Sequence, residues 1–243
     1  MKRAPKGNRM ERFERTIYIV TLVSFIIPII FLICRLIVPP VDASDPDMRT
    51  RADYVLMLLE CLLGVVVIHL PSVFEKRLRF EMPTALSIMY ILFLYGAIFL
   101  GEVRDFYYRV PYWDTILHAL SSVMAGSLGF IVVATLNRDR HVAMNLSPKF
   151  VAIFAFCFAV TIGVLWEIYE FSFDGLLGLN MQKFRLADGT VLVGHAALTD
   201  TMKDLIVDSL GALVSAAAGY FSIRKNAGWL SEIIEKHKQS VRQ

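Results

Sequence analysis

The sequence predicts an all-α polytopic membrane protein with about six transmembrane helices. Of its 243 residues, 56% are hydrophobic and only 19% are charged, which is typical of a membrane domain rather than a soluble one. Six apolar runs lie along the chain, each close to the roughly 20 residues that a spanning helix needs. Lys and Arg are concentrated in alternate connecting segments, as the positive-inside rule expects. We therefore expect a multi-pass protein of the cell (plasma or inner) membrane.

The first apolar run covers residues 16–38. It is too long for the apolar region of a signal peptide and lacks a clear small-residue cleavage site, so we expect a retained helix. The other spans are expected at 54–71, 84–103, 113–136, 150–172 and 203–223. This predicts a basic cytoplasmic tail at 1–15, a six-helix transmembrane domain at 16–223, and a cytoplasmic amphipathic tail at 224–243.

Positive charge predicts the topology. The N-terminal tail contains six Lys and Arg, the segments after the second and fourth runs contain three each, and the C-terminal tail contains five. All of these lie on one side if both termini are cytoplasmic. In the C-terminal tail, Trp229, Leu230, Ile233 and Ile234 recur at helical spacing among charged residues, which predicts an interfacial amphipathic helix. No basic patch with interleaved aromatic residues indicates nucleic-acid binding.

Two further patterns concern the last three runs. Small residues recur every four positions, which predicts close packing of the helices that carry them: Gly211, Ser215 and Gly219 in one run, and Ser122 with Gly126 and Ala125 with Gly129 in another. The outer segment at roughly 173–199 contains Asp188-Gly189 between short apolar-polar runs, which predicts either a small hairpin or a re-entrant cap.

Ionisable side chains gather at the outer ends of the same three runs, although a bilayer offers no water to solvate them. The run at 113–136 carries Asp114 and His118, the run at 150–172 carries Glu167 and Glu170, and the last helix carries Asp200, Asp204 and Asp208. From the helical rise of about 1.5 Å per residue, we expect five of them to meet at one depth near the outer leaflet: His118, Glu167, Glu170, Asp204 and Asp208.

Two interpretations of these residues stay open. Asp114 and Asp200 come at the starts of their helices, where each is either an N-cap or part of a site. The deeper groups form either a structural network, with protonated carboxylates and Arg104 or Arg185 as counter-charge, or a working site. Because converging acidic groups repel one another unless a metal, protons or a cationic ligand balances them, we favour a working site.

The order of these motifs resembles a known family. WDTILHALSS, WEIYEF, the outer Arg185 and DTMKDLIVDSLGALV follow one another over roughly 110–220. This order resembles the bacterial integral-membrane proteins typified by YjdF, a family of unassigned activity. It is more distantly similar to VanZ-like proteins, whose pattern has a glutamine and an asparagine where this sequence has Glu170 and Asp208. The resemblance implies a shared site, here more acidic, and names no reaction.

The leading functional hypothesis is a metal-dependent enzyme that acts on a membrane lipid or a lipid-linked substrate from the outer leaflet. Imidazole and carboxylate ligands suit Zn, Mn or Mg. The metal-ligand candidates are His118, Glu167, Asp204 and Asp208, while Glu170 and Asp114 are the catalytic candidates, Glu170 as general base. Neither a GxSxG nor an HExxH motif is present, which argues against a serine hydrolase or a zincin.

Two other function classes remain as alternatives. An ion- or proton-coupled small-molecule transporter would use the same carboxylates to bind a cation or protons, but the sequence shows neither an inverted repeat nor a matching inner-side series of carboxylates. A non-catalytic lipid-binding or scaffold protein would use them for stability alone. The sequence leaves the oligomeric state open.

Overall fold

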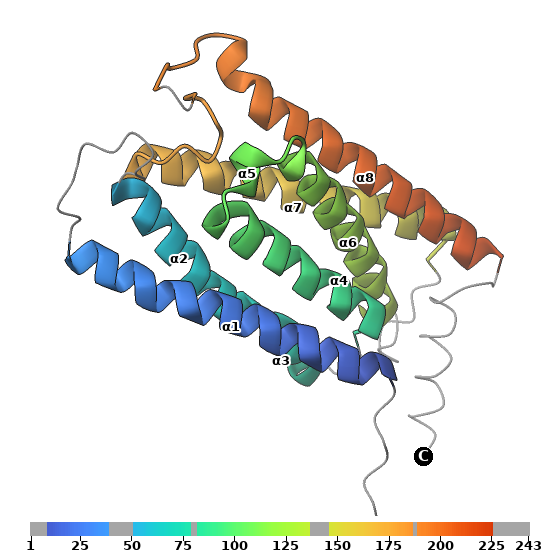
Figure 1. The fold of residues 1–243 in the computed structure, drawn as a ribbon. Coiled ribbons are helices and arrows are strands. Elements are labelled where there is room, and N and C mark those ends of the chain that lie inside the picture. The colour runs from blue at the N-terminus through green and yellow to red at the C-terminus, as the bar shows by residue number, and fades with distance from the viewer. Residues whose placement is uncertain (1–8, 39–50, 79–81, 137–145, 187–188, 226–243) are drawn as a thin grey trace, which may run out of the picture. The chain divides into compact units, whose positions relative to one another are not determined.

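The computed structural model describes residues 9–38, 51–78, 82–136, 146–186 and 189–225. It is helical, and no β-strand occurs within these ranges (Figure 1). Six helical segments are long and apolar enough to cross a membrane, which confirms the predicted fold class: Arg9–Ile37, Asp53–Val73, Thr84–Val103, Trp113–Leu136, Pro148–Leu177 and Ala196–Arg224. The chain divides into two compact units, Met1–Asp114 and Thr115–Gln243.

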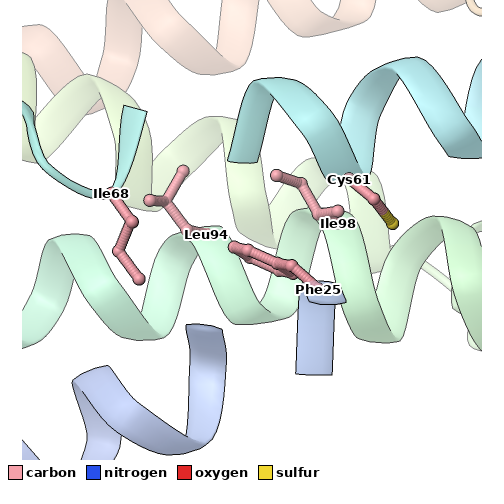
Figure 2. Packing of buried hydrophobic residues seen from close by; sticks show 5 residues of the cluster. All are labelled: Phe25, Cys61, Ile68, Leu94 and Ile98. Carbon is pink, nitrogen blue, oxygen red and sulfur yellow. The ribbon is translucent and has the colours of Figure 1, made fainter. Parts of the chain in front are cut away.

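The first unit is built on the long helix α1 (Arg9–Ile37), which packs against α2 (Arg51–Val67) and α4 (Thr84–Leu94). The other elements of this unit are α3 (Leu70–Leu78), the π-helix η1 (Tyr95–Val103) and the short α5 (Phe106–Arg109). Figure 2 shows the buried core that holds the unit together. It consists of five side chains: Phe25, Cys61, Ile68, Leu94 and Ile98.

A helix break interrupts the second span, which the sequence predicted as one run over 54–71. α2 ends at Val67 and α3 begins at Leu70. The cause is Pro71, which lacks the backbone N–H that would continue the helical ladder to Val67, four residues earlier. The Val67 carbonyl oxygen instead accepts a hydrogen bond from the Tyr90 hydroxyl at 2.7 Å. A side chain of α4 thus replaces the lost backbone bond.

The second unit consists of three long helices: α6 (Trp113–Leu136), α7 (Pro148–Leu177) and α8 (Thr199–Arg224), with the short 3-10 helix η2 (Ala196–Leu198) before the last. The α6 bounds match the predicted run. α7 begins earlier than expected because Ser147 caps it, its hydroxyl accepting from the Phe150 N–H at 3.3 Å. α7 ends at Leu177, and the residue that follows, Gly178, adopts the left-handed conformation (φ 68°) typical of a helix C-terminus.

The segment between α7 and α8 contains the predicted small hairpin. The Leu192 N–H donates to the Phe184 carbonyl at 2.8 Å, and the Leu186 N–H donates to the Thr190 carbonyl at 2.9 Å. Arg185 and Val191 form an antiparallel bridge between these bonds. Of the predicted turn pair, Asp188 lies outside the described residues, while Gly189 has φ 86°, where glycine is favoured.

Close helix packing in the second unit confirms the role expected of the small residues. A Cβ atom added to Gly129 of α6 would lie 2.8 Å from the Ala155 Cα of α7. A Cβ atom added to Gly126 would lie 2.7 Å from the Ser215 Cβ of α8. The backbone of α6 therefore approaches both other helices too closely for larger side chains.

The predicted tails are described only in part. α1 begins at Arg9, so the second half of the predicted basic tail at 1–15 is helical. The interfacial helix predicted around Trp229 falls in residues 226–243, outside the described part of the chain. The cytoplasmic location of both termini stays a prediction.

The close approach at Gly129 is testable by stability. Gly129→Ala should destabilise the protein by about 1–3 kcal/mol, because the new methyl group meets the Ala155 backbone, which has little room to move. Gly175→Ala, in α7, is the matched control, since nothing lies within 4 Å of its added Cβ. Thermal unfolding midpoints in one detergent should fall for Gly129→Ala alone. Equal midpoints for the two variants would contradict this packing.

Candidate functional site

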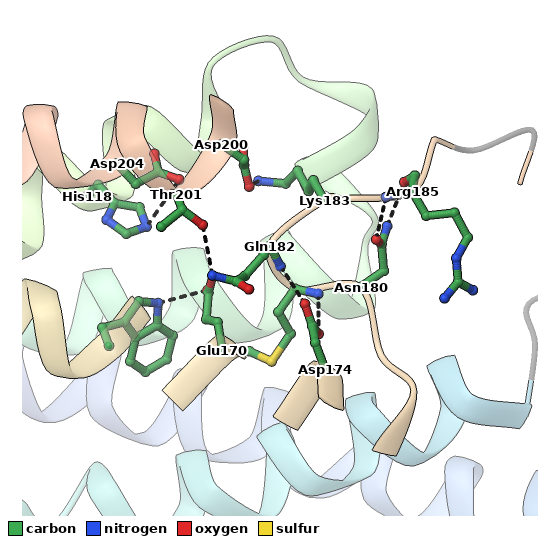
Figure 3. Close-up of polar contacts among 12 residues, drawn as sticks. His118, Glu170, Asp174, Asn180, Gln182, Lys183, Arg185, Asp200, Thr201 and Asp204 are labelled. Atoms are coloured by element: carbon green, nitrogen blue, oxygen red, sulfur yellow. Dashed lines mark hydrogen bonds and ion pairs between the residues drawn. The ribbon is translucent and has the colours of Figure 1, made fainter. Parts of the chain in front are cut away.

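The imidazole of His118, on α6, lies between two aspartates of α8. Its Nδ1 is 3.2 Å from Asp208 Oδ2, and its Nε2 is 4.0 Å from Asp204 Oδ2. All three side chains are buried, with Asp204 only 1% exposed. The two aspartates share a helix face because they are four residues apart. One histidine therefore contacts two carboxylates that are shielded from water (Figure 3 shows His118 and Asp204).

Asp114 joins this group through α6, the helix that also carries His118. Although the first unit ends at Asp114, its place one turn before His118 is fixed by that helix. One oxygen of Asp114, one ring nitrogen of His118 and one oxygen of Asp204 all lie within 4.8 Å of one another. α6 begins at Trp113, so Asp114 is in its first turn and is not the N-cap that was considered.

The two glutamates of α7 differ in their surroundings. Glu167 is 5% exposed, and neither of its oxygens has a hydrogen-bond partner of normal geometry among the described residues. His118, Thr201, Asp200 and Asp208 are close enough to interact with its carboxylate. The Oε1 of Glu170 instead accepts a hydrogen bond from the Trp166 indole at 2.9 Å (Figure 3). Both glutamates lie outside the tight group of Asp114, His118 and Asp204.

Asp174, at the end of the same acidic face of α7, is bound to the backbone that follows. Its Oδ1 accepts from the Met181 N–H at 2.7 Å, and its Oδ2 accepts from the Gln182 N–H at 3.0 Å (Figure 3). Asn180 continues the turn, its side chain accepting from the Arg185 N–H at 2.9 Å and donating to the Arg185 carbonyl at 2.8 Å. Asp174 therefore shapes the outer segment.

The outer segment is in turn attached to the start of α8. Lys183 Nζ is 3.3 Å from Asp200 Oδ2, and the Gln182 side-chain amide donates to the Thr201 hydroxyl at 2.8 Å. The N-cap of α8 is Leu198, which makes no side-chain cap bond, so Asp200 is an ion-pair partner and not the cap considered from the sequence. Sequence reasoning missed Lys183 and Gln182 because no helical period relates a loop to a distant helix.

The two arginines expected as counter-charges for the acidic group are Arg104 and Arg185, and the structure places them elsewhere. The Arg185 guanidinium lies 5.3 Å from the centre of the Phe184 ring and points away from His118 and Asp204 (Figure 3). Arg104 belongs to the first unit, where it follows the π-helix η1. Within the described part of the chain, Lys183 pairs with Asp200 of α8.

Gly163 is a second feature that sequence reasoning missed. A Cβ atom on Gly163 would lie 3.0 Å from the Asp208 Cγ, so only a glycine lets α7 pass this close to that carboxylate. Gly163 precedes Glu167 by one helical turn. This spacing places both residues on one face of α7, and it is the feature of the sequence that could have identified the glycine. The glycine thereby helps to hold Asp208 against the His118 ring.

The resulting site has more acidic groups than basic ones. Asp204, Asp208 and Glu167 are buried around a single imidazole. Among the described residues, no Lys or Arg pairs with Asp208 or Glu167. Burying several ionised carboxylates is costly unless a cation or protons compensate them. The arrangement therefore suits binding of a cation or of protons.

The role of Asp174 can be tested by hydrogen exchange. Asp174→Ala removes both acceptors of the Met181 and Gln182 amides, so these amides should exchange at least about tenfold faster, since an intramolecular hydrogen bond to a charged group contributes about 1.5–3 kcal/mol. Ser172→Ala, on the same helix, is the control, because the Ser172 hydroxyl donates to the Ile168 carbonyl of its own helix. Unchanged exchange in Asp174→Ala would show that the turn does not depend on this carboxylate.

Comparisons with known proteins place this chain among membrane proteins. The model of a family described as "Predicted membrane protein (DUF2238)" matches residues 15–225, a range that includes every candidate site residue. An uncharacterised protein of Thermotoga maritima is 32% identical over 161 residues, which cover 65% of this chain and 72% of that protein. No solved structure matches. These matches confirm the resemblance to a membrane-protein family of unassigned activity.

Proposed function

This chain belongs to the DUF2238 family of predicted membrane proteins, and we propose that it is a metal-dependent membrane enzyme acting on a lipid or lipid-linked substrate. The observation that carries the proposal is the buried group of one imidazole and several carboxylates on α6, α7 and α8. We further propose the cell (plasma or inner) membrane as its location, with both termini cytoplasmic.

The donor set fits a divalent ion. Nitrogen and carboxylate ligands bind Zn²⁺ at about 2.0–2.2 Å, so two ligand atoms of one ion are at most about 4.4 Å apart. The 4.0 Å between His118 Nε2 and Asp204 Oδ2 meets this limit. Asp114 offers the third ligand. Glu167 lies outside this tight group, and its carboxylate, close enough to interact with His118, is the proposed fourth ligand. Imidazole with carboxylates suits Zn, Mn or Mg.

Asp208 takes a different role from the ligand role expected for it. A histidine that binds a metal commonly donates its other ring N–H to a carboxylate, which fixes the tautomer and the ring orientation. Asp208 Oδ2, at 3.2 Å from His118 Nδ1, is placed to accept that proton, which leaves Nε2 for the ion. We therefore propose Asp208 as a positioning residue and Asp114 as a ligand.

The proposed reaction chemistry follows from this assignment of ligands and positioning residue. A divalent ion supplies Lewis acidity toward a phosphoryl or carbonyl oxygen. Glu170 lies outside the tight ligand group, and the Trp166 indole holds its side chain, so Glu170 serves as the general base that takes a proton from the nucleophile. Large apolar side chains beside it, Trp166, Ile168 and Phe171, are exposed on α7, which supports access for a substrate from the lipid phase.

Metal analysis of the purified protein tests the proposal. The wild-type protein, purified with Zn, Mn and Mg present, should carry about one equivalent of a divalent ion. His118→Ala and Asp204→Asn should lose it, because each removes a ligand. Asp200→Asn is the matched control on the same helix: it removes the charge that pairs with Lys183 but none of the proposed ligands, and it should keep the metal.

The outcome also separates the alternatives. Absence of a stoichiometric metal from the wild-type protein would contradict the enzyme proposal. Proton- or cation-dependent uptake by proteoliposomes, lost in His118→Ala, would instead support an ion-coupled transporter.

A second measurement separates a positioning role for Asp208 from a ligand role. Asp208→Asn should still bind the metal stoichiometrically, but about 10–100-fold more weakly, as is usual when the carboxylate behind a ligating histidine is removed. The thermal midpoint of the metal-free variant should stay near that of the metal-free wild type. Complete loss of metal would show that Asp208 is itself a ligand.

A further inference from the structure

A pocket of about 280 Å³ lies in the first unit, within the sequence range that carries none of the metal-ligand candidates except Asp114. Its wall is formed by the first turns of α1, by the break between α2 and α3, and by α4. The polar lining comes from Glu11, Glu14, Arg15 and Tyr18 of α1 and Ser87 of α4, while Ile91 of α4 and Ile68 at the break are apolar.

The polar wall of the pocket holds a fixed carboxylate. The Ser87 hydroxyl donates to Glu14 Oε1 at 2.5 Å, which ties the Glu14 side chain to α4. Ser87 itself is buried, while Glu14 is half-buried. One turn along α1, the Tyr18 hydroxyl bonds to His69 Nδ1 at 3.0 Å, so the tyrosine ring is also held in place. A carboxylate and an aromatic ring thus share one face of α1.

Next to this carboxylate, the pocket has a guanidinium. Arg15 follows Glu14 in the chain and lines the same pocket. Among the residues that the structure describes, no acidic side chain forms an ion pair with Arg15. With Glu11 also in its lining, the pocket presents carboxylates and a guanidinium to a ligand.

The floor of the pocket is apolar and its position suits a lipid. Ile68 and Ile91 are each 3% exposed. The span that contains Glu14 begins at Arg9, so the pocket lies within about three turns of a helix end, where headgroups meet the hydrocarbon core. Phe13 and Ile19, on α1, are exposed apolar neighbours suited to contact with acyl chains.

We infer that this pocket binds a zwitterionic phosphoammonium group, the headgroup of a phospholipid such as phosphatidylethanolamine. The ammonium contacts the Glu14 carboxylate and the Tyr18 ring, as carboxylates and aromatic faces attract ammonium ions. The phosphate contacts the Arg15 guanidinium, whose planar donors match phosphate oxygens. At about 280 Å³ the pocket is smaller than the roughly 300–1,000 Å³ of sites for drug-sized ligands, which suits a headgroup alone.

This inference does not depend on the proposed function of the second unit. An anionic headgroup without an ammonium would leave Glu14 facing the ligand as an unbalanced charge. A lipid with an ammonium should therefore be preferred over one without it.

Native mass spectrometry of the full-length protein, titrated in detergent with defined lipids, tests the inference. Phosphatidylethanolamine should bind at least about tenfold more tightly than phosphatidylglycerol, because only the former offers an ammonium to Glu14. Glu14→Gln and Arg15→Gln should each weaken phosphatidylethanolamine binding about tenfold or more. The amide oxygen of Glu14→Gln can still accept the Ser87 hydrogen bond, so this variant is expected to fold, and its thermal midpoint checks that.

Arg12→Gln is the matched control, since it removes one positive charge from an exposed position of the same helix that does not line the pocket. Equal affinity for the two lipids, or unchanged phosphatidylethanolamine binding in Glu14→Gln, would overturn the inference. Free phosphoethanolamine provides the last comparison. Binding as tight as that of the lipid would support the pocket's chemistry and assign the ligand to a soluble source, whereas weaker binding assigns it to the bilayer.

Discussion

Three buried carboxylates around one imidazole are the constraint on which the second unit depends. Asp204, Asp208 and Glu167 lie on apolar helices, where neither bulk water nor a described Lys or Arg side chain compensates Asp208 or Glu167. Such a group does not hold helices together by itself, since like charges repel and their desolvation is costly. The helices must therefore be held by other contacts, and the group must be balanced by a cation or protons. This is why the site is better explained by binding than by stability.

Those other contacts are of two kinds. Small residues bring the helix backbones together, as Gly129 does against Ala155 and Gly163 against Asp208. The segment between α7 and α8 adds polar attachments to α8: the Lys183–Asp200 ion pair and the hydrogen bond from the Gln182 amide to the Thr201 hydroxyl. The acidic residues of the second unit thus have separate tasks: Asp174 and Asp200 bind protein groups of the outer segment, while the deeper carboxylates face the His118 ring.

The first unit shows a different use of polar groups in an apolar helix bundle. Pro71 interrupts the second span, and the side chains around the break satisfy one another or the exposed backbone, as the Tyr90 hydroxyl does for the Val67 carbonyl. The pocket beside the break combines opposite charges over an apolar floor, whereas the second unit gathers charges of one sign. The first arrangement suits the zwitterionic headgroup that we propose for it and the second suits a cation, so the polar groups of the two units differ in their chemistry.

The fold and much of the candidate site were predictable from the sequence, because hydrophobic run length sets the spans and helical periodicity places Asp204 and Asp208 on one face. The matching bounds of the fourth span and the close packing at Gly126 and Gly129 follow from such local rules. Tertiary structure decided which groups meet. Lys183 pairs with Asp200, Arg185 turns away, and Asp208 rather than Asp204 lies within hydrogen-bonding distance of His118. Periodicity fixes a residue's direction only around its own helix axis, whereas the rotation and depth of one helix against another depend on packing at residues such as Gly163.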